Sequence, residues 1–259
     1  MNLAPASNEW VLKPRVSRDP ALRLFCFPHA GGGASLYNSW TDDLPPSIEV
    51  CPVQLPGREN LRQRAPYSQL WPLIDELLSV LREYLNLPFA FYGHSMGALV
   101  GFELTRRLRQ LLLPQPSHLF VSSYCAPQLA QRTTTLHELP DAEFLLRVQE
   151  LQGIPEAVLA NAELIELFSP LLRADFALCE SYTYSHAKPL ECAISSFGGT
   201  DDKRISAEEL AAWRVQTCSG FKMRLFPGNH FFLQSSKHLL LRVIRQELRA
   251  TLRRSPRAG

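Results

Sequence analysis

The stretch Tyr92-Gly-His-Ser-Met-Gly97 decides the fold of this chain. It follows a short apolar run that begins at Phe89, and it precedes a segment in which apolar residues recur every three or four positions from Leu99. The run predicts a buried strand, and the periodic segment predicts an amphipathic helix. The serine must therefore stand on a very tight strand-to-helix turn. Gly93 and Gly97 lack the side chains that would otherwise collide there.

In this setting, Gly-x-Ser-x-Gly is the nucleophile elbow of α/β-hydrolases. The turn holds the backbone of Ser95 in a strained conformation and lifts its hydroxyl above the sheet, at the positive end of a helix. The five-residue string alone is a weak signal, but its place between a strand and a helix makes it specific. The sequence therefore predicts a serine nucleophile at Ser95.

Further apolar runs and periodic segments extend this pattern along the chain. The runs cover residues 22–27, 50–55, 118–123, 192–197 and 222–226, and the helical periodicity covers 70–85, 99–111 and 240–252. Continuous apolar runs bounded by turn residues are typical of strands buried on both faces, as in a parallel sheet. Strands that alternate with helices predict an α/β fold with right-handed crossovers. We expect a mostly parallel central sheet flanked by helices.

One stretch interrupts the alternation. Between residues 127 and 188 there is no convincing strand, whereas Pro140, Pro155 and Pro170 each predict the start of a helix. An insertion of about 60 residues is too long for a connecting loop, and its position suggests a cap over the strand ends, where open α/β sheets bind ligands. The expected parts are a surface arm (1–20), an α/β-hydrolase core (21–126 and 189–252), a helical lid (127–188) and a frayed tail (253–259).

A serine hydroxyl is a weak nucleophile, so a base must take its proton. Of the 7 histidines, His230 is the best candidate, because it follows the last expected strand and so lies at the same sheet edge as Ser95. His94 is the neighbour of the serine in sequence, but adjacent side chains on a tight turn point apart. His230 is therefore expected to be the general base.

The acid that orients this base is expected between the serine and the histidine in chain order. Two carboxylates, Asp201 and Asp202, stand in the loop after the expected 192–197 strand. Asp202 lies three residues after Gly199 and three before Ile205, which fits a Gly-x-x-Asp-x-x-Ile pattern. Asp202 is therefore favoured as the acid, with Asp201 as the alternative.

Two backbone N–H groups are needed to stabilise a negative oxygen during acyl transfer. One is expected from Met96, directly after the nucleophile, and the other from Ala30 in the loop Phe27-Pro-His-Ala-Gly-Gly-Gly33. The glycines of this loop could also cradle a phosphate. However, the chain has neither a Gly-Lys-Ser/Thr nor a Gly-x-Gly-x-x-Gly motif, so a nucleotide site is disfavoured.

The composition argues against several classes of protein. Lys+Arg 27 against Asp+Glu 25 gives a formal net charge of +2, far from the excess of a dedicated nucleic-acid binder. No apolar run approaches the ~20 residues of a membrane span, and the first residues do not read as a secretory signal. The 6 cysteines form no Cys-x-x-Cys pair, so no disulfide framework or metal site is expected. A cytoplasmic protein that binds neither nucleic acid nor membrane is predicted.

Several further landmarks accompany the elbow. They are Phe27-Pro-His-Ala-Gly-Gly32, Gln54-Leu-Pro-Gly-Arg-Glu59, Leu172-Arg-Ala-Asp-Phe176, Phe197-Gly-Gly199 and Gly228-Asn-His-Phe231. With them the chain resembles, from about Leu22 to Leu248, the type II thioesterases of polyketide and nonribosomal peptide synthesis. It is more distantly similar to the medium-chain thioesterase of fatty-acid synthesis. One departure is Lys203, which stands where a proline usually follows the acid and keeps Asp201 open as the alternative.

The resemblance implies a triad of Ser95, Asp202 and His230, with the 127–188 lid shaping an acyl pocket. It implies hydrolysis of acyl groups from the phosphopantetheine thiol of acyl or peptidyl carrier proteins. No cofactor is expected beyond the arm that the substrate carries. The leading interpretation is a monomeric editing enzyme that clears misprimed or stalled acyl units. A chain-releasing medium-chain thioesterase, an esterase and a non-catalytic module that docks a carrier are the alternatives.

The charged residues of the landmarks also allow simpler interpretations. Arg58 could merely follow the end of a strand, and Arg173 could pair with Asp175 along a lid helix. A carrier protein is typically acidic, so basic side chains near the pocket mouth could help to dock it. Candidates for this role, or for an ordinary solvated face, are Arg58, Arg62, Arg64 and Lys203.

Overall fold

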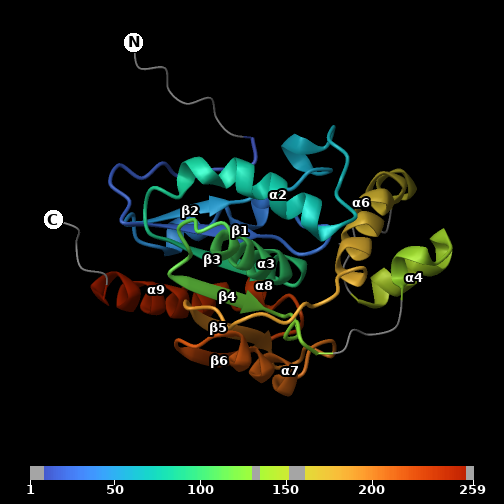
Figure 1. Ribbon diagram of the computed structural model, residues 1–259. Helices are drawn as coiled ribbons and strands as arrows, with labels where there is room; N and C mark the ends of the chain where they lie inside the picture. The colour runs from blue at the N-terminus through green and yellow to red at the C-terminus, as the bar shows by residue number, and fades with distance from the viewer. Residues whose placement is uncertain (1–8, 130–134, 152–160, 255–259) are drawn as a thin grey trace, which may run out of the picture.

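A six-stranded parallel sheet lies at the centre of the computed structural model, which describes residues 9–129, 135–151 and 161–254 (Figure 1). The strand order is β2-β1-β3-β4-β5-β6, and each neighbouring pair is parallel. The strands are β1 (Leu22–Phe27), β2 (Ile48–Pro52), β3 (Phe89–His94), β4 (His118–Ser122), β5 (Ala193–Gly199) and β6 (Phe221–Phe226). The predicted α/β class is confirmed.

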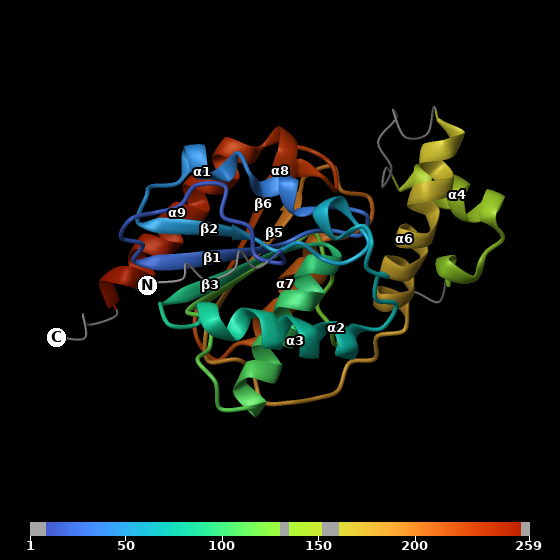
Figure 2. The same cartoon turned by 90° about the horizontal axis from the view of Figure 1, so that it is seen from above.

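Helices cover both faces of this sheet (Figure 2). On one face lie α2 (Leu70–Leu81) and α3 (Met96–Gln110), and on the other lie α1 (Trp40–Asp43), α8 (Phe232–Ser235) and α9 (Lys237–Arg254). The short helix α7 (Ala207–Ala211) packs beside β5 and β6. Single 3-10 turns lie at Ala34–Tyr37, Glu59–Leu61, Arg82–Tyr84, Leu136–Glu138 and Ala212–Gln216.

The alternation of side chains along β1 explains why both faces are covered. Phe25 and Phe27 belong to the core under α2 and α3, whereas Leu24 and Cys26 belong to the core under α9. Phe25 and Phe27 each meet Phe91 of β3 edge-on, at ring-centroid distances of 5.9 and 5.3 Å. Burying one such side chain contributes about 1.5–3 kcal/mol. A strand with apolar side chains on both faces therefore requires two helical layers.

The turn between β3 and α3 is closed by backbone contacts. A Cβ on Gly93 would lie 2.0 Å from the Gly97 carbonyl oxygen, and a Cβ on Gly97 would lie 2.1 Å from the Phe27 carbonyl oxygen. Ser95, between the two glycines, has φ 52° and ψ −119°, in the strained left-handed half of backbone space. The structure thus has the elbow that the motif predicts.

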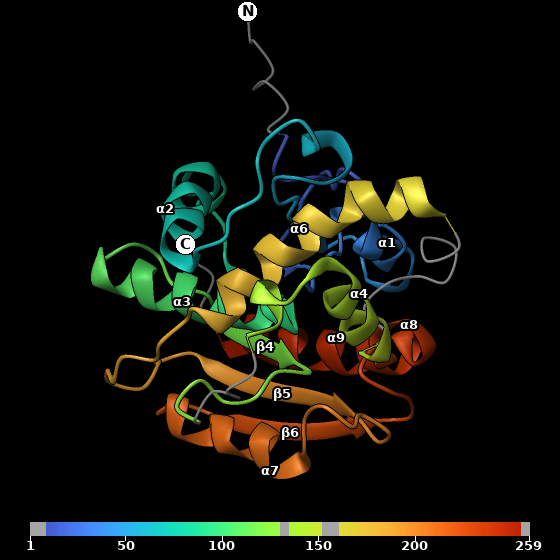
Figure 3. The same cartoon turned by 90° about the vertical axis from the view of Figure 1, so that its right-hand side faces the viewer.

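Two lid helices, α4 (Asp141–Glu150) and α6 (Ala162–Glu180), lie beyond the carboxyl ends of the strands, and α6 crosses in front of the sheet in Figure 3. The prediction that Pro170 starts a helix is wrong, since Pro170 lies inside α6. The helix begins instead after Asn161, whose side chain accepts hydrogen bonds from the N–H groups of Glu163 and Leu164. The helix expected from Pro155 falls outside the described residues.

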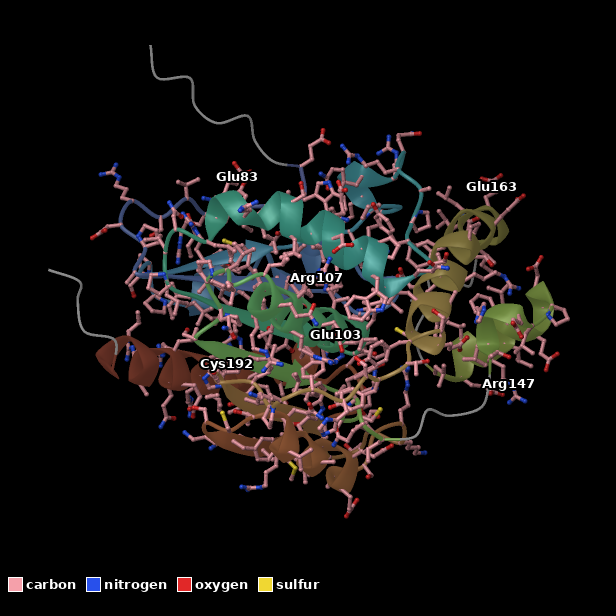
Figure 4. The ribbon with its side chains drawn as sticks, in the orientation of Figure 1. Glu83, Glu103, Arg107, Arg147, Glu163 and Cys192 are labelled. Atoms are coloured by element: carbon pink, nitrogen blue, oxygen red, sulfur yellow. The ribbon has the colours of Figure 1, made fainter. Side chains whose placement is uncertain are left out.

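A buried carboxylate ties the end of the lid to the core. Glu103 of α3 is completely buried and accepts hydrogen bonds from Arg106 and from the Tyr182 hydroxyl, which follows α6. In Figure 4, Glu103 lies within the body of the molecule, whereas Arg147 and Glu163 lie on the lid helices. The chain that leaves the lid is therefore anchored on the helix that follows the elbow.

Both ends of the described chain depart from expectation. Trp10 and Val11 are buried, and Val11 forms an antiparallel bridge with Val53, so the prediction that the whole arm lies on the surface is wrong for these residues. Their apolar side chains gain more by packing on β2 than by staying in water. At the other end, α9 continues to Arg254, two residues into the expected tail. Among the described helices, none has the length and apolarity to cross a membrane.

Replacing Gly97 by alanine should destabilise the fold by about 1–3 kcal/mol, because the new methyl group meets backbone that cannot rotate away. The matched control is Gly101→Ala in the same helix, where the nearest atom to a Cβ is Leu119 Cδ1 at 3.4 Å. Alanine is the better helix former by about 1 kcal/mol, so this control should unfold at the same or a higher urea concentration. Equal urea midpoints for Gly97→Ala and the wild type would contradict the close approach.

Candidate active site

His230 and Asp202 come together at the carboxyl edge of the sheet. Asp202 follows β5 and His230 follows β6, and the His230 Nδ1 lies 2.8 Å from the Asp202 Oδ2. Their side chains are only 4% and 1% exposed. The other carboxylate oxygen accepts the N–H groups of Arg204 (2.9 Å) and Ile205 (3.4 Å), which fixes the acid from a second side. Asp201, the alternative acid, is exposed, and its backbone N–H donates to the Gly228 carbonyl.

Ser95 and His230 line the same pocket, which has a volume of about 530 Å³. Since Nδ1 is bonded to Asp202, Nε2 is the ring nitrogen left to act on the serine. This Nε2 atom is buried and forms no hydrogen bond with any described residue. In particular, it is not bonded to the Ser95 hydroxyl. Hydrogen bonds of this kind commonly tighten only when substrate is bound. The structure thus brings the Ser95 and His230 side chains to one cavity, with Asp202 already bonded to the imidazole.

Met96 and Ala30, the expected oxyanion donors, line this pocket together with Ser95. Met96 is the first residue of α3, whose N-terminus carries partial positive charge and free N–H groups. Next to Ala30, the Gly31 N–H donates instead to Asp175 Oδ2 at 2.7 Å. The N–H of Gly31 is therefore already engaged, and Ala30 is the residue of this loop that lines the pocket together with the serine.

The charges around the base favour a neutral imidazole beside a charged carboxylate. Burial lowers the pKa of His230 below its ordinary 6.5. The hydrogen bond that His230 donates to Asp202 opposes this effect, and the positive charge of Arg204 adds to it. Burial alone would raise the pKa of Asp202. The hydrogen bonds from His230 and from two backbone N–H groups outweigh this effect and hold the pKa below its ordinary 3.8. At neutral pH the base is therefore ready to accept a proton.

Two further histidines lie beside His230. The ring centroids of His94 and His230 are 5.5 Å apart, and those of His29 and His94 are 5.9 Å apart. Burial lowers the pKa of His29 to about 4 and that of His94 well below its ordinary value. His94 turns away from the serine, as expected, and its Nδ1 meets the Ser122 hydroxyl at 2.9 Å. His29 was not predicted to approach the base, although its place in the first glycine-rich loop was the available signal.

Arg58 and Asp175 form an ion pair that the sequence did not predict. The guanidinium of Arg58 meets both oxygens of Asp175, at 2.9 and 2.8 Å. The expected pairing of Arg173 with Asp175 is wrong, because Arg173 bonds Asp141 of α4 instead. Arg58 is buried, so it is also excluded from a docking surface, whereas Arg62, Arg64 and Lys203 are exposed.

The pocket is lined by both apolar and charged side chains. Its apolar part includes Leu136, Leu151, Phe176 and Ile205, and its charged part includes Arg147, Glu150, Glu180 and Arg204. In the parts of the chain that the structure describes, no three His, Cys, Asp or Glu side chains gather as metal ligands would. The arrangement can hold an apolar chain with its reacting carbon beside Ser95, a neutral base and two N–H donors. This is the equipment for acyl transfer.

The imidazole of His230 should titrate below pH 6.5 when followed by NMR and assigned with a His230→Gln variant. Arg204→Gln removes a positive charge that disfavours the imidazolium, so the titration midpoint should move to higher pH. Arg204→Lys keeps the charge and should leave the midpoint nearly unchanged. A wild-type midpoint above 6.5 would show that the Asp202 carboxylate, and not burial, dominates.

Comparison with known proteins gives consistent matches. A family model described as Thioesterase domain matches residues 22–248. The gramicidin S biosynthesis protein GrsT of Aneurinibacillus migulanus is 43% identical over 245 residues, which cover 95% of this chain and 96% of that protein. The match therefore extends over almost the full length of both proteins.

Solved structures agree with this result. The type II thioesterase BorB from the borrelidin biosynthetic cluster has a TM-score of 0.86 and 33% identity, over 95% of this chain and 100% of that one. YbtT, a type II thioesterase from the yersiniabactin NRPS/PKS biosynthetic pathway, has a TM-score of 0.83 and 28% identity, over 94% and 99%. Together with the family match, these likenesses show that this chain belongs to the thioesterase domain family of hydrolases.

Proposed function

We propose that this protein is a serine thioesterase that hydrolyses acyl thioesters on the phosphopantetheine arm of carrier proteins. Ser95 is the nucleophile, His230 the general base and Asp202 the acid that orients it. The observation that carries this proposal is the buried Asp202–His230 bond of 2.8 Å in a pocket shared with the elbow serine. A carboxylate and an imidazole buried in this relation next to a strained serine are what nucleophilic acyl transfer requires.

Acylation begins when the Ser95 hydroxyl attacks the thioester carbonyl and the His230 Nε2 takes its proton. The carbonyl oxygen becomes negative, and the N–H groups of Met96 and Ala30 stabilise it. The carbon–sulfur bond then breaks, and the departing thiolate takes the proton from the imidazolium, which returns His230 to its neutral form. Because a thiolate is a good leaving group, the rate depends mainly on serine deprotonation and on the oxyanion donors.

Deacylation repeats these roles with water. His230 takes a proton from a water molecule, which attacks the acyl-serine ester and gives a second oxyanion between the same two donors. Collapse of this intermediate returns the proton to Ser95 and releases the carboxylic acid. Asp202 remains ionised throughout and stabilises each imidazolium, consistent with its depressed pKa. The reaction needs no cofactor beyond the arm that the substrate carries.

The substrate class follows from the relatives. One solved relative is named for an NRPS/PKS biosynthetic pathway and one sequence relative for gramicidin S biosynthesis. These names support acyl or peptidyl carrier domains as partners. We further propose that the enzyme is cytoplasmic and monomeric. Exposed Arg62, Arg64 and Lys203 are the candidate contacts for an acidic carrier.

Editing of misprimed or stalled carriers is the favoured role, and release of a medium-length chain is the second candidate. The same catalytic residues serve both, so the acyl chain is what separates them. Rates on carriers loaded with acetyl and with decanoyl groups should be compared at equal concentration. A faster acetyl reaction supports editing, and a strong preference for decanoyl supports chain release.

Ser95→Ala should lower the release of an acyl group from a loaded carrier by at least about a thousandfold, because the nucleophile is lost. Its thermal unfolding should match that of the wild type, and mass spectrometry of the carrier measures the release. Wild-type Ser95 should also be labelled by a fluorophosphonate probe. Undiminished release by Ser95→Ala would contradict the mechanism, and an inert wild-type serine would favour the non-catalytic docking module.

Asp202→Asn should reduce kcat by about a hundredfold to ten-thousandfold, because the amide no longer holds the His230 tautomer or stabilises its charged form. Asp201→Asn is the matched control from the same loop, and its kcat should stay within about twofold of the wild type. Both rates are measured on one acyl carrier under saturating conditions. If the two variants exchanged these effects, Asp201 would be the acid.

A further inference from the structure

A buried ion pair joins the lid to the segment that follows β2, beside the loop that follows β1. Arg58 comes from the segment after β2, and Asp175 comes from the lid helix α6. Their side chains are 4% and 2% exposed, and the two ions meet through two parallel hydrogen bonds. Bidentate pairs of this kind are short and fix the relative orientation of their partners. The pair therefore fixes the orientation of the other groups that bond to it.

Both ions also touch the β1 loop. Asp175 Oδ2 accepts the Gly31 N–H at 2.7 Å, and Arg58 Nη1 donates to the Gly32 carbonyl at 3.0 Å. The loop packs directly under α6, since a Cβ on Gly31 would lie 2.7 Å from Leu172 Cδ2. The loop is thus held by one ion at its N–H and by the other at its carbonyl.

These contacts act on the peptide next to the proposed oxyanion donor. The Ala30 carbonyl and the Gly31 N–H belong to one peptide plane; His29 Nδ1 meets the carbonyl at 2.9 Å, and Asp175 holds the N–H. With both polar atoms of this plane engaged, rotation about the backbone of Ala30 is restrained. Its N–H then keeps one direction relative to the pocket.

If the contact between Arg58 and Asp175 only stabilised the fold, two buried charges would not be needed. Removing both charges from water is costly, and apolar residues of similar volume often stabilise as well or better. The pair supplies a carboxylate oxygen for a loop N–H and a guanidinium for a loop carbonyl, which apolar side chains cannot offer. In addition to any stability, the charged pair thus orients the β1 loop.

We propose that Arg58 and Asp175 are positioning residues for the oxyanion hole: the lid helix, through Asp175, holds the β1 loop so that the Ala30 N–H meets the developing negative charge. This inference rests on the proposed thioesterase function and extends it. It makes the lid part of the apparatus that stabilises the transition state, in addition to its role as a wall of the pocket.

The test compares Asp175→Asn and Arg58→Lys with the wild type on an acetyl-loaded carrier protein. Loss of the loop anchor should lower kcat on the order of 10- to 100-fold with KM within about threefold, because a small displacement of a donor affects the transition state most. Binding of a short alkyl trifluoromethyl ketone should weaken by a similar factor. This compound forms a hemiketal with Ser95 and places a negative oxygen in the hole.

The matched control is Arg173→Gln on the same lid helix. Arg173 bonds the His137 carbonyl and Asp141, both within the lid, and among the described residues it makes no hydrogen bond with the β1 loop. Its kcat and its ketone affinity should stay within about threefold of the wild type. An equal loss of kcat in Arg173→Gln would show that general lid integrity is what matters, and the inference would be overturned.

A double variant controls for misfolding. Arg58→Met/Asp175→Leu replaces the pair by apolar groups of similar size and is expected to remain folded by circular dichroism. Its kcat should still fall, because the Gly31 N–H has lost its acceptor. Wild-type kcat in this folded double variant would overturn the positioning role while Ser95→Ala remained inactive. Inactivity of the wild-type enzyme on every acyl carrier would instead reject the proposed function itself.

Discussion

Contact between two backbones, at Gly97 and at the carbonyl of Phe27, is the constraint on which the site depends. Because Gly97 has no side chain, α3 can begin directly against the end of β1. A Cβ on residue 97 would collide with the Phe27 carbonyl. The serine and the first N–H of the helix are thereby fixed beside the loop that carries Ala30. The proposed nucleophile and both proposed oxyanion donors thus line one pocket, and the base and its acid are added from the loops after β6 and β5.

The neutral histidines around the base have an electrostatic meaning. During the proposed reaction a positive charge forms on His230, and another positive charge nearby would raise the barrier. Burial keeps His29 and His94 uncharged at neutral pH, so their rings fill space beside the base without repelling its imidazolium. Asp202 then provides a negative charge in direct contact with it. Packing and charge therefore favour the same protonation states.

Local patterns explain how much could be predicted from the sequence. Strands and the elbow follow from apolar runs and glycines a few residues apart, and the placement of His230 follows from parallel topology, since each strand carries its last residue to the same edge. Asp202 was separated from Asp201 only by a short motif. The Arg58–Asp175 pair was missed because its partners are 117 residues apart and no local period links them. The prediction from Pro170 was wrong because the helix begins after Asn161, an N-cap nine positions before the proline.

The bridge between Val11 and Val53 has a consequence for self-association. A parallel sheet has two outer strands whose free backbone groups can pair with a strand of another molecule. At the end of β2, residues 10–12 engage some of these groups: the Leu12 N–H donates to the Pro52 carbonyl, and the Gln54 N–H donates to the Trp10 carbonyl. At β6 the outer strand carries Lys222 and Arg224, and Lys222 is fixed by Glu247 of α9. The chain itself thus covers the end of one outer strand, and charged side chains lie on the other, which disfavours pairing with the strands of other copies.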